Sequence, residues 1–165
     1  MAEQSEHWAQ VVSIPHNPRY EAEFQKLQNV PELEFWPWLS TNMVYEVIVA
    51  RTIEVFRSKA GKCGLDISGG FKPTRDWFCY GLVLASDAFF LWKCRFVGDG
   101  SPTKADHCFH DIGYLACMAL ADGLMSCDKV LLNLAWACWP EKRDCIYSYD
   151  SMNKRVCQYR PDWES

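Results

Sequence analysis

The chain has 165 residues, of which 49% are hydrophobic, 15% aromatic and 23% charged. This composition excludes a disordered chain, a collagen and a coiled coil, because those classes lack a varied apolar core or follow a strict repeat. The formal net charge of −4 argues against a general nucleic-acid-binding protein, since no overall positive field draws the chain to phosphates. The length predicts one globular domain over 1–165, with an N-terminal arm over 1–16 and a polar hairpin over 141–165.

Three features of the sequence indicate where the protein resides. The first ten residues include Glu3 and Glu6 and lack the basic and apolar regions of a secretory signal. The most apolar segments, 77–97 and 112–139, both contain charged residues and so do not resemble membrane spans. The nine cysteines are odd in number and form no Cys-x-x-Cys pair, which predicts reduced thiols rather than disulfides or a zinc site. We therefore expect a cytoplasmic protein.

The first predicted elements are two helices. Asn17 as an N-cap and Pro18 at the first helical position predict a helix that ends at Pro31. A connection over 35–38 leads to a second helix from Asn42 to Lys59. The length of this second segment favours a helix, although its many β-branched residues favour a strand.

The middle of the chain predicts a β-hairpin followed by a long helix. Trp77–Ala85 and Phe89–Val97 are apolar runs separated by Ser86-Asp87-Ala88, which is the spacing of a hairpin. After Ser101, apolar residues recur at three and four residue steps, which predicts an amphipathic helix over about 102–126. Many of its residues are small, so we expect it to pack closely across a sheet.

The last elements predicted are strands. Lys129–Trp139 is apolar at nearly every position, which is typical of a central strand covered on both faces. Cys145–Tyr149 and Lys154–Arg160 flank a polar turn and predict a closing hairpin. The fold class expected is therefore α+β: a mostly antiparallel sheet of about four to six strands, the long helix across it and two N-terminal helices.

The densest polar cluster falls in the first half of the predicted long helix. His107, His110, Asp111 and Tyr114 are spaced so that imidazole and carboxylate groups can share one helix face and hold a metal or move a proton. The alternative is that they form the solvated face opposite the core. The string His110-Asp111-Ile112-Gly113 resembles the core of the HD phosphohydrolase motif, a resemblance that implies a metal-bound phosphoesterase.

A second enzyme class is suggested by the order of elements. With a short strand near Val11–Ile14, the order of strand, helices, antiparallel strands, long helix and strand resembles acetyltransferases of the GNAT type. Those enzymes bind pyrophosphate at a glycine-rich turn before the long helix, and here Gly98-Asp99-Gly100 precedes it. The resemblance implies an acyltransferase-like activity.

Aromatic residues in predicted loops and in the closing hairpin are candidates for partner binding. Tyrosine and tryptophan bury much area at little entropic cost, so they suit recognition surfaces. The segment at 35–38 has an alternative role as a lid folded onto the core. The candidate partner-binding residues are Phe35, Trp36, Trp38, Tyr147, Tyr149 and Trp163.

The sequence favours a binding protein over an enzyme, because no catalytic constellation is complete. We expect a small intracellular adaptor, inhibitor or accessory factor that binds another protein, with no cofactor, no metal and no membrane contact; the oligomeric state stays open. One alternative is an enzyme, acyltransferase-like or using His107, His110, Asp111 and Tyr114. Another is a single-stranded nucleic-acid-binding protein, since the closing hairpin interleaves tyrosines with Arg155 and other basic residues.

Overall fold

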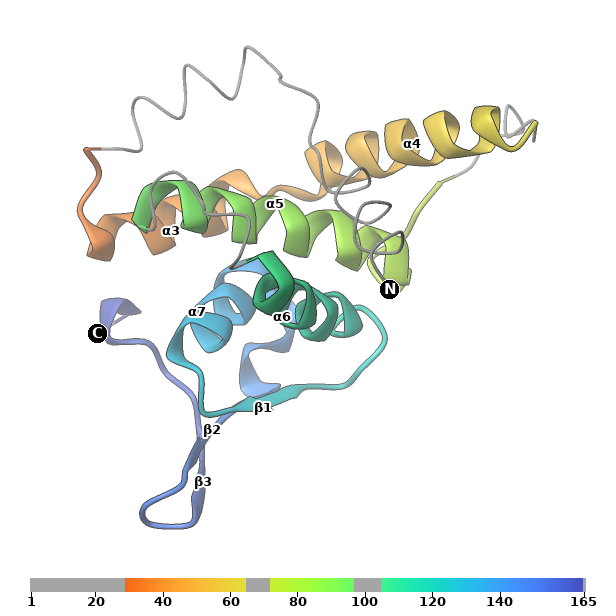
Figure 1. Ribbon diagram of the computed structural model, residues 1–165. Coiled ribbons are helices and arrows are strands. Elements are labelled where there is room, and N and C mark those ends of the chain that lie inside the picture. Colours follow the sequence, from red (N-terminus) through yellow and green to blue (C-terminus); the bar gives the residue numbers. More distant parts are fainter. Residues whose placement is uncertain (1–28, 65–71, 97–104, 165) are drawn as a thin grey trace.

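The computed structural model describes residues 29–64, 72–96 and 105–164, with the backbone alone at Cys94 and at 105–109. The predicted arm over 1–16 and nearly all of the first predicted helix lie outside these ranges. Helices predominate, and a small sheet lies at one side of them (Figure 1). In chain order the elements are α3 (Glu32–Asn42), α4 (Tyr45–Lys62), α5 (Phe78–Phe96), α6 (Ala105–Cys117), β1 (Leu124–Ser126), α7 (Lys129–Cys138), the 3-10 helix η2 (Pro140–Cys145), β2 (Ile146–Asp150), β3 (Arg155–Gln158) and the 3-10 helix η3 (Asp162–Glu164).

The sheet differs from the one predicted. It has three strands in the order β1-β2-β3, with β1 parallel to β2 and β2 antiparallel to β3. The prediction of a mostly antiparallel sheet of about four to six strands is therefore wrong for the part of the chain that is described. Two segments predicted as strands are helices, and they account for most of the difference.

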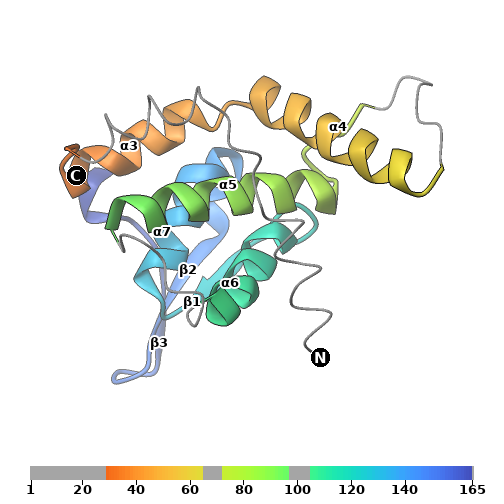
Figure 2. The same ribbon diagram turned by 45° about the horizontal axis from the view of Figure 1, so that its top comes forward.

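The first of these is α5, which replaces the predicted hairpin over 77–97. The triplet Ser86-Asp87-Ala88, expected as a turn, lies inside the helix and is buried. α5 contacts α4, α6 and α7, and it runs across the middle of the molecule (Figure 2). A helix covered on several sides is apolar nearly all round, so it loses the polar stripe that marks a surface helix.

The second is α7, which replaces the predicted central strand. Each residue from Leu131 to Cys138 is buried, so the segment shows no helical periodicity in its polarity. The side chain of Asp128 caps the helix by accepting hydrogen bonds from the backbone N–H groups of Val130 and Leu131, at 2.8 and 3.1 Å. The prediction that this segment is fully buried is confirmed, but the prediction that it forms a strand is wrong.

The long helix predicted over 102–126 is also shorter in the structure. α6 ends at Cys117, and Lys142 Nζ donates hydrogen bonds to the carbonyls of Met118 and Ala121 just beyond it. The chain then turns through Gly123, where an added Cβ would lie only 2.2 Å from the carbonyl oxygen of Cys145. This close approach brings β1 alongside β2, so the end of the predicted helix is a strand.

Two predictions of local structure are confirmed. α4 covers nearly the same residues as the predicted helix over 42–59, and β2 with β3 forms the predicted closing hairpin. The element order that resembled an acetyltransferase, with antiparallel strands before the long helix, is not present, because Phe78–Phe96 is helical.

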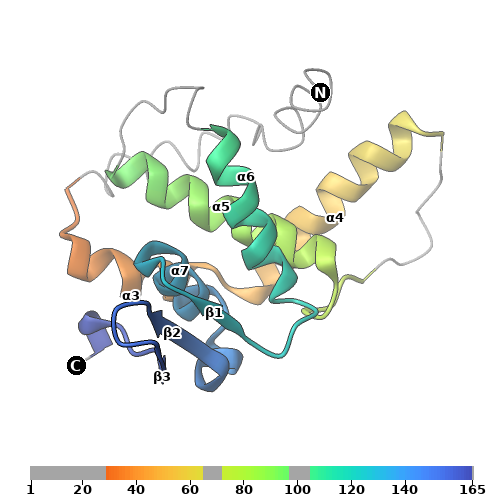
Figure 3. The same cartoon turned by 60° about the horizontal axis from the view of Figure 1, so that its bottom comes forward.

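The core lies where α3, α5 and α7 meet. Phe35 of α3 is fully buried, and its ring lies 5.2 Å from that of Phe96 in an edge-to-face arrangement. The sheet packs against the far side of α7, away from α5 (Figures 1 and 3). Free thiols are found at Cys63, Cys79, Cys117, Cys127, Cys138, Cys145 and Cys157. Within the described ranges, the helices are too short or too polar to cross a bilayer.

Candidate functional site

The C-terminal hairpin is fixed to α7 by a buried polar contact. Tyr159, which follows β3, donates a hydrogen bond from its hydroxyl to Oδ1 of Asn133 at 2.6 Å, and Nε1 of Trp163 donates to the same oxygen at 3.3 Å. Burial raises the pKa of Tyr159 to about 12, with a further contribution from the Asp162 carboxylate, so the hydroxyl stays a donor at neutral pH. These hydrogen bonds therefore anchor the end of the hairpin to α7.

The solvent-facing side of the sheet carries a group of large apolar side chains. Register pairs Met125 with Tyr147 and Tyr149 with Val156, and side chains paired in this way project to the same face. Their exposed fractions are 59, 39, 38 and 54%, in that order, whereas the neighbouring Ile146 is fully buried. We call these four residues the outer sheet face.

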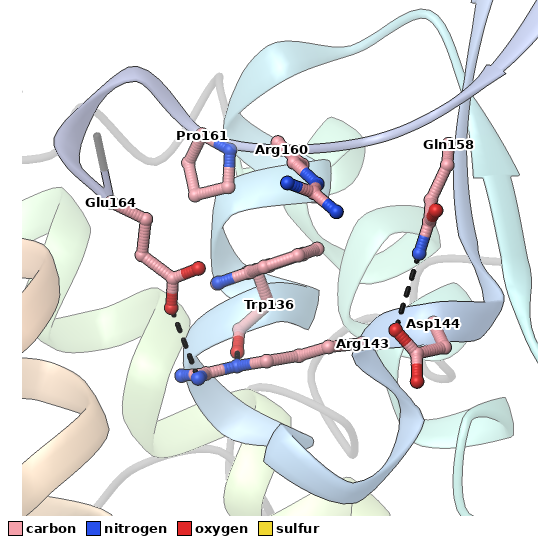
Figure 4. A pocket seen from close by; sticks show the side chains of 7 residues that line it. All are labelled: Trp136, Arg143, Asp144, Gln158, Arg160, Pro161 and Glu164. Atoms are coloured by element: carbon pink, nitrogen blue, oxygen red, sulfur yellow. Dashed lines mark hydrogen bonds and ion pairs between the residues drawn. The ribbon is translucent and has the colours of Figure 1, made fainter.

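A pocket lies between the hairpin, η2 and the chain's last described turn. It has a volume of about 390 Å³ and opens to solvent (Figure 4). Its walls carry two arginines, two acids, an amide, a proline and an indole ring. We call it the C-terminal pocket, and its lining residues are Trp136, Arg143, Asp144, Gln158, Arg160, Pro161 and Glu164.

Arg143 forms the floor of this pocket and is held on several sides. Its Nε donates to the carbonyl of Trp136 at 3.1 Å, and its Nη2 donates to Oγ of Ser40 at 3.3 Å. Its Nη1 forms an ion pair with Oε1 of Glu164 at 3.0 Å. The guanidinium also lies over the Trp136 ring, 5.4 Å from its centroid. Arg143 is thus a fixed cation with one carboxylate partner.

Arg160 differs from Arg143, because it is exposed and makes no hydrogen bond or ion pair with the described residues. Its guanidinium lies on the opposite side of the Trp136 indole from Arg143 (Figure 4). Gln158, the last residue of β3, donates a hydrogen bond to Oδ1 of Asp144 at 3.2 Å and lies opposite Tyr147 in the sheet. The outer sheet face and the pocket are therefore neighbours.

The six residues predicted to bind a partner fall in different environments. Phe35 and Trp36 are 0% and 2% exposed, in α3 rather than in a loop, and Trp38 packs against the same core. This placement fits the alternative in which the segment covers the core. Trp163 is half-buried by its contact with Asn133. Tyr147 and Tyr149 are exposed, as a partner-binding role requires.

The predicted catalytic cluster lies on α6, apart from the C-terminal pocket. His110 and Tyr114 are exposed, and Asp111 is half-buried. The side chain of His107 lies outside the described residues. No group of three histidine, cysteine or acidic side chains suited to a metal occurs among the residues that are described. The described side chains of this cluster, those of His110, Asp111 and Tyr114, do not line the pocket.

Sequence reasoning missed Met125, Val156 and Trp136 as surface or pocket residues. Met125 was placed in the long helix, and Trp136 in a central strand, so neither was assigned to this region. The signal available in the sequence is the two-residue spacing of Tyr147 and Tyr149, which places both side chains on one face of a strand.

A buried ion pair joins α4 to α5 in the helical part. Arg51 of α4 pairs with Asp87 of α5, whose side chain is almost fully buried. Burial raises the pKa of Asp87 to about 7, although the Arg51 guanidinium acts to lower it. Burial, with a smaller contribution from Asp87, raises the pKa of the Cys138 thiol well above its usual value, so this cysteine is not a thiolate nucleophile.

Comparison with known proteins gave no relative: no protein-family model, no curated protein and no solved structure matches this chain.

Proposed function

We propose that the protein acts by binding another protein, and that the outer sheet face is the surface the partner covers. The observation that carries this proposal is the exposure of Met125, Tyr147, Tyr149 and Val156 side by side on one face of the sheet. Isolated apolar side chains are common on protein surfaces, but an adjacent group of four marks a surface that interacts.

The chemistry of these side chains suits a protein partner. Tyr147 and Tyr149 lie two residues apart on β2, so both rings face the same way. Tyrosine offers a large apolar ring with a polar hydroxyl and few rotatable bonds, which is why it is enriched among energetically important interface residues. Met125 and Val156 flank the tyrosines in register and extend the apolar area onto both neighbouring strands.

Rigidity supports the same proposal. The tyrosines stand on a strand whose neighbour is held to α7 through Tyr159 and Asn133. A surface that is already ordered loses little conformational entropy on binding, so more of its contact energy appears as affinity. The charged C-terminal pocket next to the apolar face corresponds to the polar rim that surrounds the centre of many interfaces.

The proposal is tested by site-specific photo-crosslinking. A photoreactive phenylalanine analogue at Tyr147 is expected to crosslink to one defined protein in native extract, which mass spectrometry identifies. The same analogue at Met152, which is 92% exposed at the hairpin turn, serves as the matched control and should not. The purified partner should then bind the wild-type protein at least tenfold more tightly than a Tyr147→Ser/Tyr149→Ser variant, since each 1.4 kcal/mol is about tenfold.

Three results would contradict the proposal. Equal crosslinking from both positions would mean that contact is not confined to the outer sheet face. Crosslinking only to a second copy of the chain would make the face a self-association surface. Tight binding of a single-stranded oligonucleotide that weakens steeply with salt would favour the nucleic-acid function instead.

A further inference from the structure

We propose that the C-terminal pocket binds a carboxylate presented by an acidic segment of the partner protein, in the place now taken by Glu164. This inference rests on the proposed function and adds to it the chemistry of one part of the partner. The juxtaposition that carries it is a fixed arginine, a second arginine without a partner among the described residues, and a buried indole N–H in one pocket.

The two arginines provide the positive charge. Arg143 is held by Trp136 and Ser40 in a single orientation, and Arg160 lies on the other side of the Trp136 ring (Figure 4). A guanidinium presents its N–H groups in a planar fork that matches the two oxygens of a carboxylate. Because Arg143 is held in place before any ligand arrives, binding requires no large reorganisation of this side chain.

Glu164 shows what chemical group the pocket accepts. Its carboxylate is already paired with Arg143 at 3.0 Å, and both side chains keep about a third of their surface exposed, 35% and 29%. Ion pairs that are exposed to water are weak. An acidic segment that pairs one carboxylate with Arg143 and a neighbouring one with Arg160, on the other side of the Trp136 ring, would replace Glu164, because it gains a second cation that Glu164 does not contact.

Trp136 adds a donor to the same pocket. The residue is only 5% exposed, and its Nε1–H has no hydrogen-bond partner among the described residues. Figure 4 shows the nitrogen edge of the indole directed toward the side on which Glu164 lies. Indole nitrogen donates and never accepts, so a ligand that satisfies it must bring an acceptor oxygen.

The acids of the pocket limit the choice of ligand. Asp144 accepts a hydrogen bond from Gln158 and places one acidic side chain at the side of the pocket, and Glu164 adds a second. A group with a single negative charge, such as a carboxylate, meets less repulsion here than a dianionic phosphate. The pocket therefore favours aspartate or glutamate side chains over phosphorylated residues.

The test uses NMR titration of the full chain with a blocked hexaglutamate peptide, and with hexaglutamine as the uncharged control. The Trp136 indole and arginine Nε–H resonances are expected to shift with hexaglutamate alone. Glu164→Gln should tighten binding several-fold, because the internal competitor is removed. Arg160→Gln should weaken it about tenfold, which is the loss of one charge-assisted contact.

Arg155→Gln is the matched control, because Arg155 is an exposed arginine of the same hairpin outside the pocket. It should leave the affinity within twofold of wild type. Equal weakening by both arginine variants would overturn the proposal, since the peptide would then bind the general charge of the hairpin. An unchanged affinity in Glu164→Gln would also overturn it, as would tighter binding of inorganic phosphate than of hexaglutamate.

These results separate the two proposals. If the crosslinked partner binds the Arg160→Gln variant as tightly as wild type but does not bind the Tyr147→Ser/Tyr149→Ser variant, the pocket inference fails and the proposed function stands. If hexaglutamate binds as expected while no partner contacts Tyr147, the proposed function fails and the pocket remains a carboxylate site.

Discussion

The hydroxyl of Tyr159 donates a 2.6 Å hydrogen bond to Oδ1 of Asn133, and this contact joins the end of the C-terminal hairpin to the middle of α7. Both residues are buried, so the pair is shielded from competition by water. The outer sheet face and the C-terminal pocket depend on the position of the hairpin, and this hydrogen bond helps to set that position.

Removing the Tyr159 hydroxyl should therefore weaken the fold. Tyr159→Phe keeps the ring and is expected to lower the free energy of unfolding by about 1–2 kcal/mol, because a buried hydrogen bond is lost. Urea denaturation measures the change. Tyr147→Phe removes an exposed hydroxyl and should alter stability by less than about 0.5 kcal/mol. Equal losses in the two variants would mean that the hydrogen bond to Asn133 contributes nothing specific.

A pair of glycine substitutions tests the packing of α5 on α6. An added Cβ at Gly81 would lie 2.5 Å from the carbonyl oxygen of Ala116, whereas one at Gly113 would meet nothing within 4 Å. Gly81→Ala is expected to destabilise by roughly 1–3 kcal/mol through forced separation of the helices. Gly113→Ala should stabilise by up to about 1 kcal/mol, since alanine is the better helix former. Thermal unfolding shows whether each variant is more or less stable than the wild type. A gain in stability in both variants would refute the close contact between Gly81 and Ala116.

The Arg51–Asp87 pair predicts a pH dependence of stability. Burial raises the pKa of Asp87 to about 7, from its ordinary value of 3.8, so the folded state holds this proton more tightly than the unfolded state. The contribution of the protonated Asp87 side chain to the free energy of unfolding is fully present below the pKa of this carboxyl in the unfolded state. It is lost as the pH rises through about 7, at up to roughly 1.4 kcal/mol per pH unit. The charged and titratable neighbours identified are Arg51 on α4 and Cys138 on α7.

Asp87→Asn removes this titration while keeping the size of the side chain. Denaturant unfolding of the variant and the wild type between pH 4 and 8 gives the difference in stability at each pH. That difference should change steadily from pH 4 to 7 in favour of the variant and then level off. A constant difference across the range would show that Asp87 does not titrate there.

The cap of α7 provides a fourth prediction. Asp128 accepts hydrogen bonds from two backbone N–H groups at the start of the helix. Asp128→Ala is expected to cost about 1 kcal/mol of stability, the usual loss for an N-cap. Asp122, an exposed acid in the preceding turn, is the control, and Asp122→Ala should change the urea midpoint little. A similar loss in both variants would point to general charge effects.

The elements predicted correctly from the sequence are those with one face exposed to solvent, because their polar and apolar residues then follow a pattern. The closing hairpin was predicted because its strands are bounded by a polar turn, and α4 because its length exceeds that of ordinary strands. α5 and α7 were mistaken for strands because burial on several sides removes polar periodicity, and an apolar run of this kind fits either backbone. The N-cap role of Asp128, a residue type typical of helix starts, was not predicted.

The candidate site was predictable only in part. Tyr147 and Tyr149 were identified because tyrosines in a polar closing hairpin suit a recognition surface, which is local information. The pocket joins Trp136 of α7 to Arg160, which follows β3, and this proximity depends on how the hairpin folds back. Phe35 and Trp36 were candidates because aromatic loops suit binding, but α3 turns both rings into the core. Such distant contacts have no signature in sequence spacing.

The parallel pairing of β1 with β2 places α7 inside a crossover whose second strand comes after the helix in the chain. During synthesis from the N-terminus, α7 emerges from the ribosome before Ile146 and Tyr159, the buried side chains that cover its outer side. For that interval its apolar surface is open to water. A premature stop before Ile146 would release a polypeptide whose α7 lacks this cover, which is the kind of surface that chaperones and proteases of the cell recognise.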